Sequence, residues 1–265
     1  MGGAAVTASR AKAALRVVTP RPVQRAVHDR RVDGALAREF FEGRTELDGY
    51  RAQLEQTPLL SSLSEARARF AETVSGTTSS GSPYSFGGFG PRAGSRLYAL
   101  IRRLSPSVVV ETGVCNGASS ALILQALNDN GSGHLHSIDV PEYEGESRPS
   151  ELWGGKGGAV VPDRREPGWV IPHALRDRWS LTLGRSQEEL GPLLERVGAV
   201  DLFLHDSEHS YECMMFEFTT VYPHVKSGGV IATDDMGYND AFGEFAAGVS
   251  RRVFRLDDGV ALIRK

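Results

Sequence analysis

Two apolar runs of the sequence each end in carboxylates. The run DLFLH is followed by Asp206, and the run GGVIAT is followed by Asp234 and Asp235. If both runs are strands that end at one edge of a sheet, three carboxylates lie in one cleft and repel each other unless a cation is present. Carboxylate oxygens suit Mg²⁺, whose remaining positions take water or substrate oxygens. The pattern therefore favours a metal site, and metal-free helix caps are the alternative.

A histidine lies one helical turn beyond the first of these acids. His209 follows Asp206 by three residues. Neutral imidazole has a pKa close to neutrality, which suits a general base. The alternatives are a hydrogen-bonding or capping histidine and a direct metal ligand. His205 precedes Asp206 and is expected to point away from the cleft, because successive strand residues face opposite sides of a sheet.

A glycine-containing turn follows an earlier apolar run, in SVVVETGVCNGASS. Gly113 and Gly117 allow a tight turn and a close approach of the backbone to a ligand, and the next helix offers unpaired N–H groups at its start. In the dinucleotide motif G-x-G-x-x-G the middle glycine lets a pyrophosphate approach, and Cys115 stands at that place here. Asp139 ends the next apolar run, where a carboxylate can accept hydrogen bonds from both hydroxyls of a ribose. An acid in a surface turn is the alternative for Asp139.

These residues need parallel strands to bring them together. From residue 92 onward, short apolar runs alternate with segments whose apolar residues have helical spacing, which predicts a mostly parallel sheet covered by helices on both faces. The last segment, RRVFRLDDGVALIRK, has a hairpin signal at Asp258-Gly259. Ligands bind such sheets at the carboxyl ends of the strands. Asp234 and Asp235 both face one cation there only if the chain is already leaving the strand.

Two long segments do not fit this alternation. Residues 1–91 are expected to form a helical N-terminal extension with a Gly/Ser-rich loop at 76–94, which is either a lid over the site or a plain linker. Residues 92–265 are expected to form the main domain. An insertion rich in Gly, Pro and charge, residues 141–178, separates the second and third predicted strands. It either folds over the ligand edge of the sheet or is a surface loop.

Composition argues against several classes of protein. The net charge of −3 is unlike that of a general nucleic-acid binder, and no apolar stretch is long enough to cross a membrane. Cys115 and Cys213 suit neither a disulfide framework nor a metal knuckle. The sequence also lacks the apolar core of a signal peptide. A cytoplasmic protein with a small-molecule partner is expected, and the N-terminal helices are candidates for contacts in a homo-oligomer.

Five motifs in order resemble the class I S-adenosylmethionine-dependent methyltransferases. They are VVVETGVCNGASS, HSIDV, GRSQEEL, DLFLHDSEHSYE and GGVIATDD. They are most similar to the metal-dependent O-methyltransferases that act on sugars and natural products, and the resemblance covers about residues 92–265. It implies an α/β fold with a Rossmann-like, mostly parallel seven-stranded sheet and a C-terminal antiparallel hairpin. The activity that it implies is Mg²⁺-dependent methylation of a hydroxyl on a small molecule.

The resemblance also implies roles for residues around the cofactor, S-adenosyl-L-methionine. Asp139 would hold the ribose. Ser186 would lie near the adenine, and the alternative for this residue is that it caps the helix that it begins. The residues expected to line the methionine part of the cofactor are Glu111, Gly113, Gly117 and Ser119.

For the catalytic centre, the resemblance assigns Mg²⁺ or another divalent cation to Asp206, Asp234 and Asp235. A hydroxyl bound beside a cation loses its proton more easily, and His209 would accept that proton. Two other functions remain open at this point. One is a cofactor-binding accessory protein of a tailoring or hydroxylation system that does not methylate. The other is an NAD-linked dehydrogenase, which needs a pyrophosphate-type glycine pattern that the turn lacks.

Overall fold

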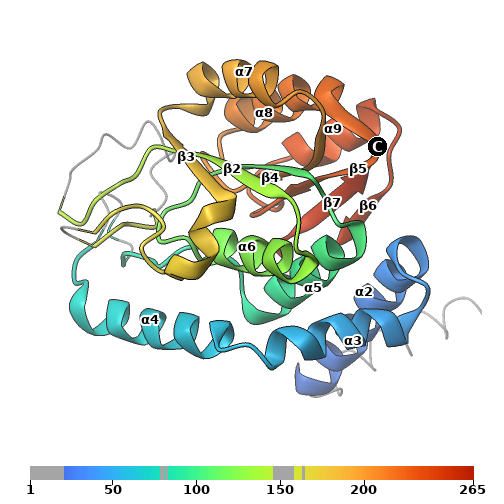
Figure 1. Cartoon of the computed structure of the whole chain (residues 1–265), viewed down its shortest axis with the longest axis horizontal. Helices are drawn as coiled ribbons and strands as arrows, with labels where there is room; N and C mark the ends of the chain where they lie inside the picture. Colours follow the sequence, from blue (N-terminus) through green and yellow to red (C-terminus); the bar gives the residue numbers. More distant parts are fainter. Residues whose placement is uncertain (1–20, 78–80, 82, 146–157, 163–164) are drawn as a thin grey trace, which may run out of the picture.

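Seven strands form one sheet in the order β3-β2-β1-β4-β5-β7-β6 (Figure 1). The computed structural model describes residues 21–77, 81, 83–145, 158–162 and 165–265. Strands β1 to β5 run parallel to one another, whereas β7 runs antiparallel to both β5 and β6. The strands are β1 (Val108–Thr112), β2 (His134–Asp139), β3 (Trp179–Leu183), β4 (Val200–His205), β5 (Val225–Thr233), β6 (Val253–Arg255) and β7 (Ala261–Arg264).

Alternate strand residues pack into two separate cores, one on each face of the sheet. Val109 of β1 and Leu202 of β4 lie in one core, and their successors Val110 and Phe203 lie in the other. All four side chains are fully buried. This burial on both faces explains why the central strands read as unbroken apolar runs rather than as alternating ones.

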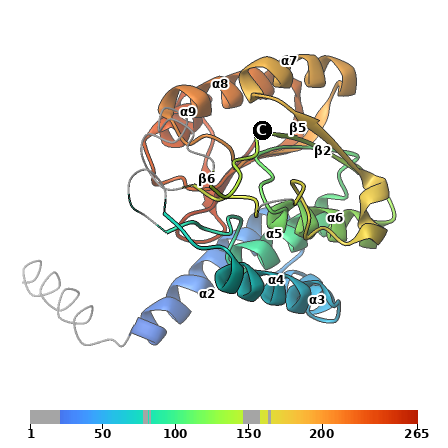
Figure 2. The same cartoon turned by 90° about the vertical axis from the view of Figure 1, so that its left-hand side faces the viewer.

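Helices cover both faces of the sheet. In Figure 1, α7, α8 and α9 lie above it, and α5 and α6 lie below it with α2, α3 and α4 farther out. Figure 2 shows the same layers from the side. The helices are α2 (Arg21–Phe40), α3 (Arg44–Glu55), α4 (Leu59–Thr73), α5 (Pro91–Leu104), α6 (Ala118–Asn130), α7 (Ser186–Val197), α8 (Tyr211–Val221) and α9 (Ala241–Gly248), with 3₁₀ turns η2 (His173–Arg178) and η3 (Tyr222–His224).

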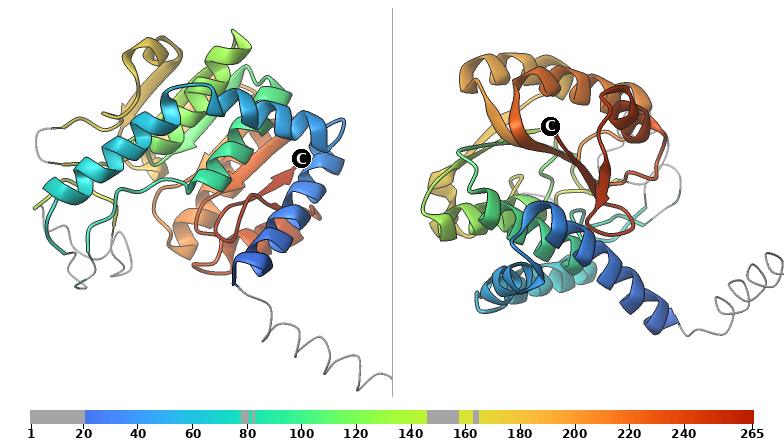
Figure 3. Two further views of the ribbon diagram at one scale, coloured as in Figure 1. Left: turned by 90° about the horizontal axis from the view of Figure 1, so that it is seen from below. Right: turned by 90° about the vertical axis from the view of Figure 1, so that its right-hand side faces the viewer.

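The N-terminal helices pack on the layer formed by α5 and α6. Figure 3 shows α3 and α4 following one another across that layer. A buried guanidinium joins α2 to the main domain: Arg96 Nε donates to Asp33 at 2.6 Å, and its Nη1 donates to the carbonyl of Leu256 at 2.6 Å. Asp29 accepts a further bond from Arg96 at 3.0 Å. Because Arg96 is only 1% exposed, its charge depends on these partners, and they fix the place of α2.

The predicted fold is confirmed: the sheet has seven strands, is mostly parallel and ends in an antiparallel hairpin. Strand order reverses between β1 and β4, which is where an open α/β sheet binds its ligand. Parts of the predicted N-terminal extension, of its Gly/Ser-rich loop and of the insertion lie outside the described residues, namely 1–20, 78–80, 82, 146–157 and 163–164. The described helices include none with the length and apolar character needed to span a membrane.

Candidate active site

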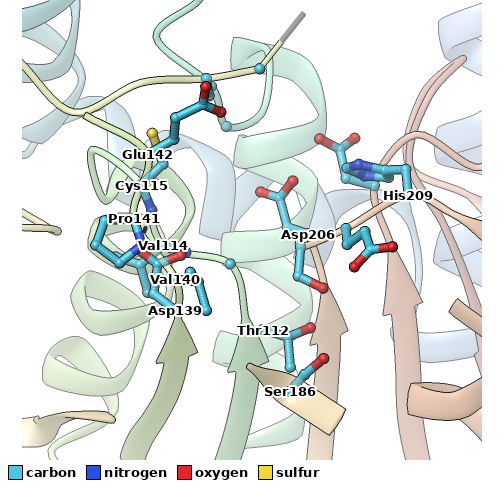
Figure 4. Close-up of a pocket in the computed structure, with 18 of the residues that line it drawn as sticks. Thr112, Val114, Cys115, Asp139, Val140, Pro141, Glu142, Ser186, Asp206 and His209 are labelled. Atoms are coloured by element: carbon cyan, nitrogen blue, oxygen red, sulfur yellow. Dashed lines mark hydrogen bonds between the residues drawn. The ribbon is translucent and has the colours of Figure 1, made fainter. Parts of the chain in front are cut away.

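A cavity of about 410 Å³ opens at the carboxyl ends of β1, β2, β4 and β5. Figure 4 shows Asp139 and Glu142 on one side of it and Asp206 and His209 on the other. The site residues predicted from the sequence that line this cavity are Gly113, Asp139, Ser186, Asp206, His209, Asp234 and Asp235. The topology thus gathers residues that lie up to 122 positions apart, from Gly113 to Asp235.

Gly113 lets the end of β1 approach the end of β4. Its φ is +86°, and a Cβ at this position would overlap the main-chain carbonyl of Asp206. The Gly113 N–H donates to the carbonyl of Ile138 in β2 at 2.8 Å. Only glycine combines this backbone conformation with such a close approach, so Gly113 fixes how three neighbouring strands meet at the cavity.

Asp139 is tied to the glycine turn. Its two carboxylate oxygens accept from the backbone N–H groups of Val114 at 3.1 Å and Cys115 at 3.3 Å. Cys115 has a left-handed backbone, with φ +48°. Each carboxylate oxygen can accept more than one hydrogen bond, so these bonds are compatible with the ribose contact expected of Asp139.

Glu111 lies beneath the turn, away from the cavity wall. It is fully buried, and its carboxyl group accepts from the hydroxyls of Ser119 at 2.9 Å, Ser120 at 2.6 Å and Ser137 at 2.8 Å. Burial raises the pKa of Glu111 to about 7, against the opposing effect of the three hydroxyls. Glu111 and Ser119 therefore brace the turn from below, and their predicted contact with the cofactor stays a prediction.

Gly117 faces the insertion. It has φ +91°, and a Cβ here would lie 2.7 Å from the Cα of Gly168. The N–H of Gly168 donates to the carbonyl of Cys115 at 2.8 Å, and the N–H of Val170 donates to that of Asn116 at 3.2 Å. The described end of the insertion is therefore packed against the glycine turn rather than standing off the surface.

Ser186 is the first residue of α7, and Arg185 occupies the cap position before it. The Ser186 hydroxyl lies 3.7 Å from Cys213 Sγ, and it helps to lower the pKa of Glu217. The interpretation of Ser186 as a helix cap is therefore wrong. Its place on the cavity wall is compatible with the predicted position near the adenine, which stays a prediction.

Three carboxylates meet at the ends of β4 and β5. These strands are neighbours, with His205 level with Thr233, and the charges of Asp234 and Asp235 both act on Asp206. Asp235 has φ +48°, so the chain has already left the strand at this residue. This is the condition under which Asp234 and Asp235 can face the same cation.

The acids disturb one another's ionisation. Burial and the charges of Asp234, Glu111 and Asp235 raise the pKa of Asp206 well above its usual range. Burial and Asp235 raise the pKa of Asp234 to about 6, and burial raises that of Asp235. Oxygen donors with unrelieved repulsion fit a hard divalent cation. In the described parts of the chain, however, no three His, Cys, Asp or Glu side chains are already gathered as a metal site.

His209 lies beside this cluster. Its Nε2 is 3.9 Å from Asp235 Oδ2, and its ring centre is 5.2 Å from that of His205 and 5.3 Å from that of Tyr238. Burial and the charge of His205 lower the pKa of His209 to about 3. The imidazole is therefore neutral near pH 7, as a proton acceptor must be, but it holds a proton weakly. Its role as the base stays a prediction.

A buried polar network below the cavity was not expected from the sequence. Glu217 of α8 accepts from Thr112 Oγ1 at 2.6 Å and Ser207 Oγ at 2.7 Å, and it lies 2.7 Å from His205 Nδ1. Burial raises the pKa of Glu217, but His205 and the hydroxyls outweigh it, so the pKa is lowered. His205 points away from the cavity, as expected. The available signal was Glu217, an acid between two phenylalanines in the helix sequence YECMMFEFTTV.

Other parts of the cavity wall come from segments without a readable motif. Arg67 of α4, Phe86 of the following loop, Glu142 of the insertion and Tyr238 after β5 all line it. Each lies in a region where the sequence pattern predicts only a helix or a loop. Their approach to the site depends on long-range packing, which a local pattern does not encode.

Comparison with known proteins agrees with this geometry. Residues 110–236 match the sequence model of the family described as a methyltransferase domain, and no curated protein matches the chain. The SAH-bound methyltransferase PaMTH1 of Podospora anserina is 17% identical, with a TM-score of 0.50 over 78% of this chain and 86% of that one. The O-methyltransferase NovP is 17% identical, with a TM-score of 0.52 over 70% and 84%.

These identities are too low to carry over a substrate, but they agree with the fold. The family match includes the glycine turn at Gly113, the acid Asp139 and all three carboxylates at the ends of β4 and β5. Residues 110–236 therefore resemble a methyltransferase domain in sequence, and the chain has the Rossmann-like fold found in methyltransferases that its motifs predicted.

Proposed function

We propose that the protein transfers the methyl group of S-adenosyl-L-methionine to a hydroxyl of a small molecule, with Mg²⁺ or another divalent cation at the site. The observation that carries the proposal is a single cavity that holds both the glycine turn at Gly113 and the acids Asp206, Asp234 and Asp235. NovP is an O-methyltransferase, and its structural similarity favours oxygen as the acceptor. A sugar or another natural product with adjacent hydroxyls is the substrate class proposed.

The cofactor would lie along the turn and across the end of β2. A pyrophosphate needs a glycine at the middle position of the turn so that the backbone can approach it closely, and Cys115 stands at that position here. S-adenosyl-L-methionine has no phosphate and does not need that glycine. Asp139 would accept from the ribose while keeping its bonds to the turn. Ser186, on the same cavity wall, would lie toward the adenine. This placement leaves the acid cluster at the far end for the substrate.

The acids would hold the cation through Asp206, Asp234 and Asp235. A divalent cation, when bound, makes a nearby hydroxyl easier to deprotonate and fixes its position. The raised pKa values of Asp206 and Asp234 favour their protonated forms, and a ligand carboxylate must lose its proton. The cation would therefore compete with protons for these two residues.

Methyl transfer to oxygen leaves one proton to remove. The substrate oxygen bonds to the methyl carbon as the carbon–sulfur bond breaks, so the cofactor becomes a neutral thioether and the hydroxyl proton needs an acceptor. His209 is neutral and lies 3.9 Å from Asp235 Oδ2. A carboxylate so close stabilises an imidazolium. We assign the proton to His209, with Asp235 as the group that stabilises it.

Labelled methyl transfer onto a panel of glycosides and catechols, with and without Mg²⁺, tests the proposal. Asp206→Asn and Asp235→Asn should each reduce turnover at least ~100-fold, because each removes a charge that the cation requires, while cofactor binding by calorimetry persists. The exposed Asp177→Asn is the matched control. Full turnover by both site variants sinks the metal mechanism. Cofactor binding without turnover of any hydroxylated compound favours the accessory role instead.

A further inference from the structure

An arginine side chain from the N-terminal helices reaches the cavity. Arg67 of α4 lines the cavity wall. Its Nη2 donates to the main-chain carbonyl of Phe89 at 3.1 Å, and its guanidinium carbon lies 4.7 Å from the centre of the Phe86 ring. These two contacts hold the planar guanidinium in place and leave most of its five N–H donors for other partners.

Arg67 forms no ion pair with a carboxylate of the described residues, whereas the other arginine on the cavity wall does. Arg185 lies 3.8 Å from Glu208. Within the described part of the chain, burial is the cause that lowers the pKa of Arg67, and no acid offsets it. The guanidinium remains protonated near neutral pH. A half-buried cation without a counter-charge, facing a cavity, is suited to an anionic group of a ligand.

The contacts of the loop that carries Phe86 show which end of the cavity Arg67 serves. The carbonyl of Phe86 accepts from Asn116 Nδ2 at 2.9 Å. A Cβ on Gly88 would lie 2.8 Å from the Cβ of Ala118 and 3.5 Å from the backbone nitrogen of Ser119. The loop therefore lies on the glycine turn and the first turn of α6. The charges of the acid cluster do not contribute to the pKa of Arg67, which agrees with this placement.

We propose that Arg67 binds the carboxylate of the cofactor's methionine part. This inference rests on the proposed function, in which the glycine turn lines that part of the cofactor. The carboxylate is the one anionic group of S-adenosyl-L-methionine, and a guanidinium can bind it through two parallel hydrogen bonds. The N-terminal helices then supply a cofactor contact, although they lie outside the matched methyltransferase domain. The competing source of a carboxylate is an acidic substrate.

Calorimetry with two ligands distinguishes these sources. S-adenosylhomocysteine has the amino acid carboxylate, and 5′-methylthioadenosine lacks it. We expect Arg67→Met to weaken S-adenosylhomocysteine binding ~10- to 100-fold, the usual effect of losing a charged hydrogen bond, and to leave 5′-methylthioadenosine binding unchanged. Arg67→Lys should retain part of the affinity. The control is Arg69→Met on the same helix, since Arg69 is 72% exposed and pairs with Glu65 at the surface.

Each other outcome counts against the inference. If Arg67→Met weakens both ligands equally, Arg67 only shapes the loop, and thermal unfolding of the variant shows whether the fold has changed. If neither ligand is affected, the anion comes from the substrate and the inference is wrong while the proposed function stands. If the wild-type protein binds neither ligand, the proposed function itself fails, and the inference fails with it.

Discussion

The buried carboxyl of Glu111 should make the protein less stable as the pH rises. Its pKa is raised from 4.5 to about 7 in the folded protein, so between these values the folded state binds more protons than the unfolded state. The free energy of unfolding then falls with increasing pH across this window and levels off above it. A shift of about 2.5 units corresponds to about 3 kcal/mol, at about 1.4 kcal/mol per unit.

Glu111→Gln isolates this effect because glutamine has the same shape and does not titrate. Near pH 5 the neutral glutamic acid and the amide should give similar stabilities. By pH 8 the variant should gain about 3 kcal/mol relative to the wild type, provided that its amide still bonds to Ser119, Ser120 and Ser137. Urea denaturation of both proteins at pH 5, 6, 7 and 8 measures the difference.

The exposed Glu195→Gln is the matched control, and its difference from the wild type should be nearly constant over this range. A constant difference for Glu111→Gln as well would refute the reasoning, because it would mean that the folded protein does not resist ionisation of Glu111. A difference that grows in the opposite direction would mean that the serine hydroxyls outweigh the cost of burying the charge. Urea denaturation can separate these results, because the expected change in the free-energy difference is about 3 kcal/mol.

Three further predictions concern the strand ends and the acid cluster. Gly113→Ala should lower the free energy of unfolding by more than ~2 kcal/mol in urea denaturation, because its Cβ would overlap the backbone of Asp206. The control is Gly191→Ala within α7, where a Cβ meets no other atom, and it should be neutral or stabilising by up to ~1 kcal/mol. Glu217→Gln should cost about 3 kcal/mol, because it leaves a buried histidine without its charged partner. Mn²⁺ binding should release protons from Asp206 and Asp234, whose pKa values are raised. Calorimetry in two buffers at pH 6 detects this release as a buffer-dependent enthalpy.

The sheet could be predicted because its strands are buried on both faces and its turns contain glycine. Continuous apolar runs such as SVVVET and VDLFLH are typical of strands in the interior of a parallel sheet, where both faces are buried. The N-terminal extension was expected to be helical, but no motif located α3 within it, because only Leu47 and Leu54 of its twelve residues are buried. A helix with so narrow an apolar stripe has a weak periodic signal, and its packing against α5 decides its conformation.

The site could be predicted only where chemistry follows strand ends. Asp139, Asp206 and Asp234 follow from the rule that ligands bind at the carboxyl ends of parallel strands, and they line the cavity. Arg67 and Tyr238 do not follow from it, because their positions depend on how a helix and a loop pack over the sheet. The burial of Glu111 beneath the turn was also beyond a sequence pattern, since the pattern does not show which side of the backbone an acid occupies.

Asn116 explains how the unpredicted parts are held to the predicted ones. It is 1% exposed and sits within the glycine turn. Its Nδ2 donates to the carbonyls of Phe86 and Val160, each at 2.9 Å, and its Oδ1 accepts from Trp169 Nε1 at 2.5 Å. One side chain thus joins the N-terminal loop and two parts of the insertion to the turn expected to bind the cofactor. Breaking any of these bonds leaves a buried polar group unsatisfied, which costs free energy. Loss of structure in the loop or in the insertion is therefore expected to destabilise the glycine turn as well.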